Sequence, residues 1–169
     1  MNIFLLGFMG SGKSSLGRKL AKRLGRTFVD LDDLIEVKTG QSISTIFSEK
    51  GEAYFRTIER EVLMGFNPEG EYVVSLGGGA PCSESNIGFI QTVGMSIYLK
   101  EPEDVLFGRL RGNKKERPLI ANLNDAALKQ FISDKLSERE KFYERADFVF
   151  EKSKTTWPFL ISQIDRYIK

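Results

Sequence analysis

Glycines and one lysine come together near the amino end of the chain, over residues 7–15. Gly7, Gly12, Lys13 and Ser14 fit the spacing G-x-x-x-x-G-K-[ST] of a phosphate-binding loop. Glycines leave backbone N–H groups free to surround phosphate oxygens, the lysine binds the β- and γ-phosphates, and the hydroxyl is a ligand of Mg²⁺. The alternative is a glycine-rich turn with a chance lysine. The spacing favours a site for a nucleoside triphosphate with Mg²⁺.

The rest of the loop narrows the class of nucleotide. Gly10 and Gly12 begin a G-x-G-x-x-G pattern, but Ser15 stands where a dinucleotide-binding loop has its third glycine. This argues against a dinucleotide site, and we expect the nucleotide phosphates to contact the residues Gly10, Ser11, Gly12, Lys13, Ser14 and Ser15.

Three aspartates follow the next apolar run, and they are the nearest acidic partners for a metal. Asp30 and Asp32 alternate in a segment that reads as extended, so their side chains point the same way. In an open α/β sheet the carboxyl ends of the strands line the ligand crevice, which places both beside the phosphates. Helix capping is the alternative; we favour a functional role for Asp32 and capping for Asp33.

Arg56 and Glu59 lie three residues apart and can pair on one helix face, next to Phe55. A solvated ion pair is the simpler interpretation of such a pair.

Gly77, Gly78 and Gly79 follow another apolar run. Three glycines cost backbone entropy, so we expect a ligand to approach their N–H groups closely; a tight turn is the alternative.

Positive charge gathers after residue 108, in Arg109, Arg111, Lys114, Lys115 and Arg117, opposed only by Glu116. Such runs are usually solvated surfaces. Beside a phosphate-binding loop, however, the segment can close over the phosphates and bring a cation to the transition state. We expect a mobile lid over residues 111–124.

Composition limits the other possibilities. The 169 residues carry a formal charge of +2, which gives no reason to expect nucleic acid or a membrane as partner. Cys82 is the only cysteine and there is no histidine, so we expect a reducing, cytoplasmic compartment and acid–base chemistry by carboxylates. We expect Cys82 to be a small buried residue rather than a redox group.

Apolar runs at 2–6, 27–30, 72–76, 95–99 and 148–150 predict five strands. Helical periodicity predicts helices between them: 14–24, a short one ending near Gly40, one capped by Ser44 and ending at Gly51, 52–66, 84–91, 102–110, 126–145 and 157–168. This alternation predicts a single α/β domain over 1–169, a parallel sheet covered on both faces.

Several motifs together resemble the shikimate kinase family, small members of the P-loop kinases related to nucleoside monophosphate kinases. They are Gly-Ser-Gly-Lys-Ser at 10–14, Asp-Leu-Asp at 30–32, Gly-Glu-Ala-Tyr-Phe-Arg-Thr-Ile-Glu at 51–59, Leu-Gly-Gly-Gly-Ala at 76–80, Arg-Pro-Leu at 117–119, and Arg139 ahead of Tyr143. The resemblance implies a three-layer α/β/α fold with strand order 2-3-1-4-5. It also implies transfer of the γ-phosphoryl group of ATP to the 3-hydroxyl of shikimate, in aromatic amino-acid biosynthesis.

By position, the resemblance makes Lys13, Asp32 and Arg117 the catalytic residues, with Asp32 as base or orienting group. Ser14 and Asp30 hold Mg²⁺, Asp30 mostly through waters, and Arg109 lies near the adenine, with further contacts at 153–155. The substrate segment is 31–62, and the expected shikimate contacts are Asp32, Arg56, Gly77, Gly78, Gly79, Arg139, Phe47 and Phe55. Of these, Arg56 and Arg139 bind the carboxylate, and Gly78 donates its N–H to a hydroxyl. We expect a monomer.

The residues agree with such a substrate, because a small carboxylate suits paired arginines and a polyol needs an acceptor such as Asp32. A related kinase for gluconate is one alternative. A nucleotide-controlled switch that binds a partner is another, although it has no need of the arginine pair. A nucleic-acid-binding role is less favoured because the charge is nearly neutral.

Overall fold

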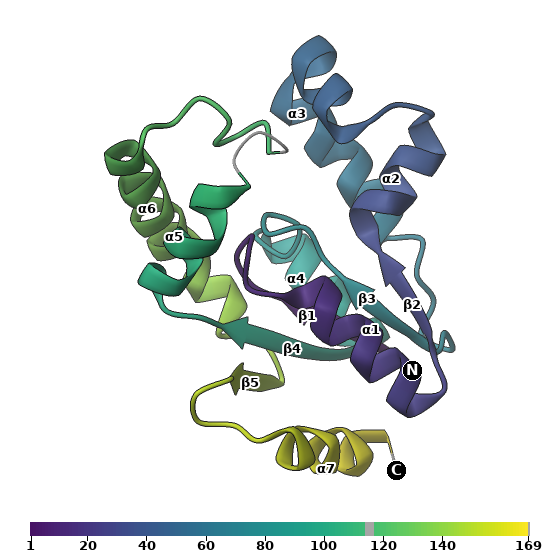
Figure 1. The fold of residues 1–169 in the computed structure, drawn as a ribbon. Coiled ribbons are helices and arrows are strands. Elements are labelled where there is room, and N and C mark those ends of the chain that lie inside the picture. Colours follow the sequence, from purple (N-terminus) through teal and green to yellow (C-terminus); the bar gives the residue numbers. More distant parts are fainter. Residues whose placement is uncertain (114–116, 169) are drawn as a thin grey trace.

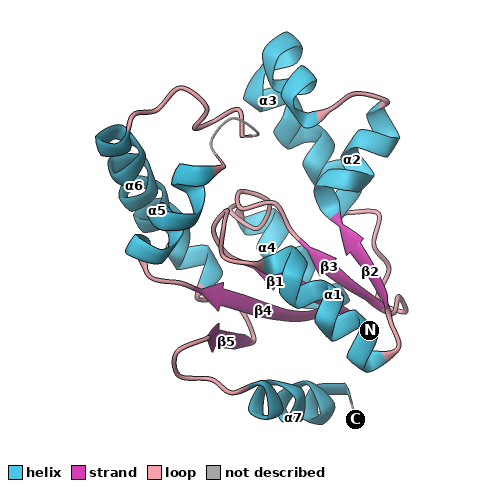
Figure 2. Ribbon diagram, viewed as in Figure 1, coloured by secondary structure: helices cyan, strands magenta, loops and turns pink. Residues whose placement is uncertain are grey.

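The computed structural model describes residues 1–113 and 117–168. Parallel strands form a five-stranded sheet in the order β2-β3-β1-β4-β5, as the resemblance implied (Figure 1). The strands are β1 Asn2–Leu6, β2 Thr27–Asp30, β3 Tyr72–Ser75, β4 Gly94–Lys100 and β5 Phe148–Glu151. The helices are α1 Lys13–Leu24, α2 Leu31–Thr39, α3 Ile43–Leu63, α4 Glu84–Val93, α5 Glu103–Gly112, α6 Asp125–Tyr143 and α7 Trp157–Ile168 (Figure 2).

Alternation along the central strand β1 explains the layers. Ile3 and Leu5 belong to a core cluster with Leu20 of α1 and Leu160 of α7. Phe4 belongs to the opposite cluster, which includes residues of α2, α3, α4 and α6. Successive side chains of a strand point to opposite faces, and every residue of β1 is buried, so the strand is sandwiched between helices.

A third cluster lies beside the sheet, where Phe8 of the phosphate-binding loop packs with α5 and α6. Ile120, between those two helices, is fully buried in this cluster. The segment that we expect to act as a lid is therefore attached to the phosphate-binding loop through Ile120. Its charged residues at 114–116, among them Lys114 and Lys115, lie outside the described residues.

Several helix boundaries differ from the expectation by one to three residues, among them the start of α3 and the end of α5. Ser42, not Ser44, caps α3, since its side chain accepts a hydrogen bond from the Thr45 N–H at 3.1 Å. Gly51 does interrupt the helical backbone, with φ 80° and ψ 173°, where the sequence predicted a break. Helix α5 continues to Gly112, so the first residues of the expected lid are helical. No helix of the described residues has the length and apolar character needed to span a membrane.

Candidate active site

The phosphate-binding loop has the backbone that its glycines permit. Gly7, Gly10 and Gly12 have φ angles of 138°, 80° and 98°, which side-chain-bearing residues rarely adopt. A Cβ atom on Gly7 would also lie 2.7 Å from the carbonyl oxygen of Leu99 in β4. Helix α1 begins directly after Gly12, so its unpaired N–H groups and positive dipole end face the loop.

Lys13 is buried inside this loop. Its ammonium group donates hydrogen bonds to the carbonyl oxygens of Gly7 at 2.9 Å and Phe8 at 2.8 Å. Burial lowers the pKa of Lys13 to about 8; Asp32 opposes the shift and Arg117 adds to it. The loop thus holds a desolvated cation that gains from an incoming phosphate.

Oxygen donors next to Lys13 fit Mg²⁺. The Ser14 hydroxyl donates to Asp30 Oδ2 at 2.8 Å and lies 3.3 Å from the Ser75 hydroxyl at the end of β3. A hard cation prefers such oxygens. The described residues contain no group of three or more His, Cys, Asp or Glu suited to a metal, so water and phosphate oxygens would complete the shell. Ser75 was not expected; its signal is its place at the end of a buried strand that enters a glycine run.

The cap of α2 is a correction to the sequence analysis. Asp30 is the N-cap residue, and its Oδ1 accepts from the Asp32 N–H at 3.2 Å. The expectation that Asp33 caps the helix is wrong, because β2 runs into α2 without a loop and the capping position falls at the last strand residue. Capping fixes Asp30 and leaves the Asp32 side chain available.

Asp32 carries an unsatisfied acceptor. Its Oδ1 atom is buried and has no hydrogen-bond partner among the described residues. Burial, with a smaller contribution from Asp30, raises the pKa of Asp32 to about 6, although Lys13 and Arg56 oppose the shift. A buried acceptor with raised basicity can take a proton from a hydroxyl group placed against it.

Arg56 and Glu59 pair as the sequence predicted, but the pair is not a solvated one. The shortest contact, Arg56 Nη1 to Glu59 Oε2, is 2.7 Å, and the Glu59 side chain is 1% exposed. Burial alone would lower the pKa of Arg56, but Glu59 and Glu52 raise it above its usual value. Burial raises the pKa of Glu59, and Arg56 limits that rise. The pair holds the guanidinium at the cavity while Glu59 Oε1 has no hydrogen-bond partner among the described residues.

Arg139 is a buried cation. It is 5% exposed, and it forms no ion pair with the residues that the structure describes. Its guanidinium lies over the ring of Phe8 at 5.6 Å. Because an uncompensated buried charge is costly, an anionic ligand would be strongly favoured here.

The side chains packed against the turn at 77–79 explain why it consists of glycines. A Cβ atom on Gly77 would lie 2.8 Å from Glu59 Oε1, one on Gly78 would lie 3.3 Å from Arg139 Nη1, and one on Gly79 would lie 2.6 Å from Arg56 Cζ. No described residue accepts a hydrogen bond from the N–H groups of these glycines. The chain does turn here, and glycines at all three positions allow three charged side chains to approach the backbone closely.

These groups surround one cavity of about 360 Å³. Its lining includes the expected substrate contacts and adds Met9, Glu36, Ile43 and Leu119. Phe47 and Phe55 form its apolar side, with ring centroids 4.8 Å apart. Arg117 lines the same cavity, so the structure brings together Asp32, Arg56, Arg117, Arg139 and the glycine turn.

A larger cavity of about 690 Å³ lies on the other side of the phosphate-binding loop, lined by Gly10, Ser11, Gly12, Arg109 and residues 152–157. Arg109 donates to the Gly10 carbonyl oxygen at 2.8 Å and pairs with Glu101 at 3.1 Å. Trp157, which was not expected, also lines this cavity, with Lys19 over its ring at 4.1 Å. Arg111 instead forms an exposed ion pair with Asp125 at 2.8 Å.

Cys82 is half-buried against the core, and burial raises the pKa of its thiol to about 11. A thiol in that state is unreactive. This agrees with a packing role.

The chain is similar throughout its length to shikimate kinases. A family model described as shikimate kinase matches residues 9–168. The shikimate kinase of Bacteroides thetaiotaomicron is 40% identical over 150 residues, 89% of this chain and 86% of its own. That of Salinibacter ruber is 41% identical over 151 residues, 86% of this chain and 74% of its own.

Structures agree with the sequences. The crystal structure of the B. thetaiotaomicron enzyme has a TM-score of 0.84 at 37% identity, covering 99% of this chain and 96% of its own. Shikimate kinase from Acinetobacter baumannii, in complex with shikimate, has a TM-score of 0.86 at 36% identity, covering 99% of this chain and 92% of its own. Deoxyadenosine kinase from M. mycoides shares the P-loop kinase fold alone, with a TM-score of 0.59 at 14% identity.

Proposed function

The chain belongs to the shikimate kinase family, and from this premise we propose that it transfers the γ-phosphoryl group of ATP to the 3-hydroxyl of shikimate. The observation that carries the proposal is one cavity next to the phosphate-binding loop. It holds the buried Arg139 cation, which pairs with no described acidic residue, and Asp32 Oδ1, which has no described hydrogen-bond partner. A cation and an acceptor at these places match a carboxylate and a hydroxyl on the same small molecule.

Arg139 and Arg56 bind the carboxylate of shikimate. Asp32 accepts a hydrogen bond from the reacting hydroxyl and takes its proton as the bond to phosphorus forms. The proton goes to the Asp32 carboxylate, and the γ-phosphoryl group leaves the β-phosphate oxygen of ATP for the shikimate oxygen. Phosphoryl transfer is governed by placement and charge, so aligning that hydroxyl with the phosphate is the main contribution of this cavity.

Lys13 and Arg117 meet the phosphates from two sides. Lys13 exchanges the carbonyl oxygens of Gly7 and Phe8 for β- and γ-phosphate oxygens, and Arg117 reaches the transferring group from the lid segment. Ser14 and Asp30, with Ser75 beside them, hold Mg²⁺, which neutralises charge on the β- and γ-phosphates when bound. The adenosine part of ATP lies in the larger cavity beside Arg109.

The test is ADP release in a coupled assay with shikimate, gluconate and nucleoside monophosphates as acceptors, each with and without Mg²⁺. We expect turnover with shikimate and Mg²⁺ and little with the other acceptors. Equal turnover on gluconate would contradict the proposal. If ADP were released from ATP at the same rate with and without each acceptor, the nucleotide-controlled switch would be favoured instead.

A further inference from the structure

Helix α6 presents two buried side chains to the glycine turn. Arg139 and Tyr143 lie four residues apart, one helical turn, and are 5% and 0% exposed. Arg139 meets the turn at Gly78, and the Tyr143 hydroxyl donates a hydrogen bond to the Gly78 carbonyl oxygen. The same helix therefore supplies a ligand-binding cation and a hydrogen bond to the backbone beside it.

That carbonyl belongs to the peptide group that joins Gly78 to Gly79. In a trans peptide the N–H lies on the opposite side from the carbonyl, so holding the Gly78 oxygen also fixes the direction of the Gly79 N–H. This N–H has no acceptor among the described residues, and Gly79 lines the smaller cavity next to Arg56. Tyr143 is thus joined through one rigid peptide to an unused donor at the site.

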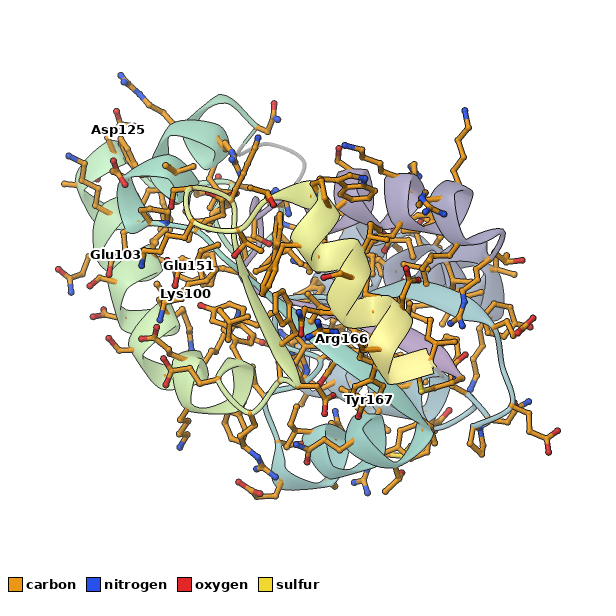
Figure 3. All side chains as sticks on the ribbon, turned by 90° about the horizontal axis from the view of Figure 1, so that it is seen from below. Lys100, Glu103, Asp125, Glu151, Arg166 and Tyr167 are labelled. Carbon is orange, nitrogen blue, oxygen red and sulfur yellow. The ribbon has the colours of Figure 1, made fainter. Side chains whose placement is uncertain are left out.

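Tyr143 adds to the hydrogen bonds that hold the glycine turn, which are Ala80 N–H to Gly77 O, Cys82 N–H to Gly79 O, and a long contact from Cys82 Sγ to Gly78 O at 3.5 Å. Glycine peptides rotate more freely than others, and those of Gly77, Gly78 and Gly79 carry no side chains to limit them. Tyr143 itself is firmly placed: its ring packs on Tyr98 with centroids 5.1 Å apart. Lys100, labelled in Figure 3, attaches α6 to the end of β4 by ion pairs to Glu140 at 2.7 Å and Glu144 at 3.2 Å. Burial raises the pKa of Tyr143, so its hydroxyl remains a donor at any physiological pH.

We propose that Tyr143 is a positioning residue of the substrate cavity: its hydroxyl holds the peptide between Gly78 and Gly79 so that the Gly79 N–H is preset, between the Arg56 and Arg139 guanidinium groups, for the carboxylate of the acceptor. The inference rests on the proposed function. Its hydroxyl holds the Gly78 carbonyl and also lies close to the Arg139 guanidinium, so Tyr143 acts on the cavity through these two neighbours. Presetting a donor reduces the entropy lost when the ligand binds.

The experiment compares Tyr143→Phe with Tyr98→Phe in the full-length protein. Tyr143→Phe removes one buried hydrogen bond and keeps the ring, so we expect KM and the calorimetric Kd for shikimate to rise about three- to tenfold. We expect kcat and the KM for ATP to stay within about twofold, because a binding interaction shared by ground and transition states leaves kcat unchanged. The rise in KM should be the same from pH 6.5 to 8.5, as expected for a hydroxyl that does not titrate there.

Tyr98→Phe is the matched control. It removes the hydroxyl of the ring that packs on Tyr143 and that has Lys100 Nζ over it, 5.9 Å from the centroid, and we expect shikimate KM to stay at the wild-type value. An unchanged shikimate KM in Tyr143→Phe, or an equal rise in both variants or for both substrates, would overturn the inference. A wild-type protein that does not use shikimate would instead contradict the proposed function.

A second measurement does not depend on the stability of the variant. In wild-type protein labelled with ¹⁵N, the Gly79 amide resonance should shift on addition of shikimate, more than that of Gly88 in α4. A Gly79 resonance that shikimate leaves in place would also overturn the inference.

Discussion

Asp32 lies where its charge is poorly solvated, beside Asp30 and under the glycine turn. The raised pKa means that the folded protein holds the Asp32 proton more tightly than the unfolded chain. The resulting cost to stability is absent below the unfolded pKa of 3.8, grows as the pH rises, and is complete above about 6. The residue thus gains basicity at the expense of folding free energy.

The Asp32→Asn variant tests both consequences. We expect phosphoryl transfer to fall by about two powers of ten or more, because the amide cannot accept the hydroxyl proton. We also expect the variant to be more stable than wild type at pH 7, by about 1–3 kcal/mol, with the difference shrinking as the pH falls from 6 to 4. Steady-state kinetics and urea unfolding at several pH values measure the two effects. Wild-type turnover in Asp32→Asn would exclude Asp32 as the base.

Arg139 and Arg117 line the same cavity, but the proposal gives them different tasks. The carboxylate that Arg139 binds keeps its charge through the reaction, so Arg139→Ala should mainly raise the shikimate KM. Arg117 meets charge that redistributes during transfer, so Arg117→Ala should mainly lower kcat, by about 10³-fold for an arginine-finger role. Arg117→Lys should restore only part of this loss, since an ammonium lacks the planar fork. A raised KM with unchanged kcat in Arg117→Ala would show that this residue only encloses the site.

Among the elements, the glycine turn is the one whose backbone is crowded by functional side chains. A methyl group on Gly79 would lie 2.6 Å from Arg56 Cζ and push the guanidinium from its place. We expect Gly79→Ala to raise the shikimate KM by about tenfold or more, the size of one displaced charged contact. Gly88→Ala in α4 is the control, because nothing lies within 4 Å of its added Cβ. That substitution should leave KM unchanged and stabilise the helix by up to about 1 kcal/mol; a shikimate KM that moves equally in both variants would contradict this account.

At the scale of elements the sequence predicted most of the fold. All five strands and the sheet order are confirmed, because buried parallel strands are short apolar runs and glycines mark the ends of helices. The cap of α3 was placed two residues late, since both Ser42 and Ser44 can cap and only backbone geometry distinguishes them. The sequence motifs predicted that Asp32, Arg56 and Arg139 belong to the site, and all three line the smaller cavity. The motifs could not give the burial of Glu59 or the contact of Ser75 with Ser14, which depend on packing between distant segments.

In the whole molecule, the third core cluster joins the phosphate-binding loop to the lid segment through Phe8 and Ile120. Ile120→Ala removes a fully buried side chain and should cost about 2–5 kcal/mol of stability. At temperatures well below the melting temperature of the variant, where it is still folded, it should also lower kcat. The reason is that Arg117 lies three residues away on the same turn. Leu160→Ala is the control: Leu160 is equally buried, but on the far side of the sheet with α7. A similar loss of stability without a loss of kcat is expected there, and equal kcat values in the two variants would contradict the coupling.

The phosphate-binding loop lines both cavities, the larger through Gly10, Ser11 and Gly12 and the smaller through Met9. A single compound that tethers a purine to a small hydroxylated carboxylate could therefore occupy both at once. Once one end is bound, a tether of matched length keeps the other end at an effective concentration of about millimolar, so the affinities combine without any new contact. Selectivity against other P-loop enzymes would come from the carboxylate end, since that end needs a buried arginine that pairs with no acidic residue in the described part of the chain.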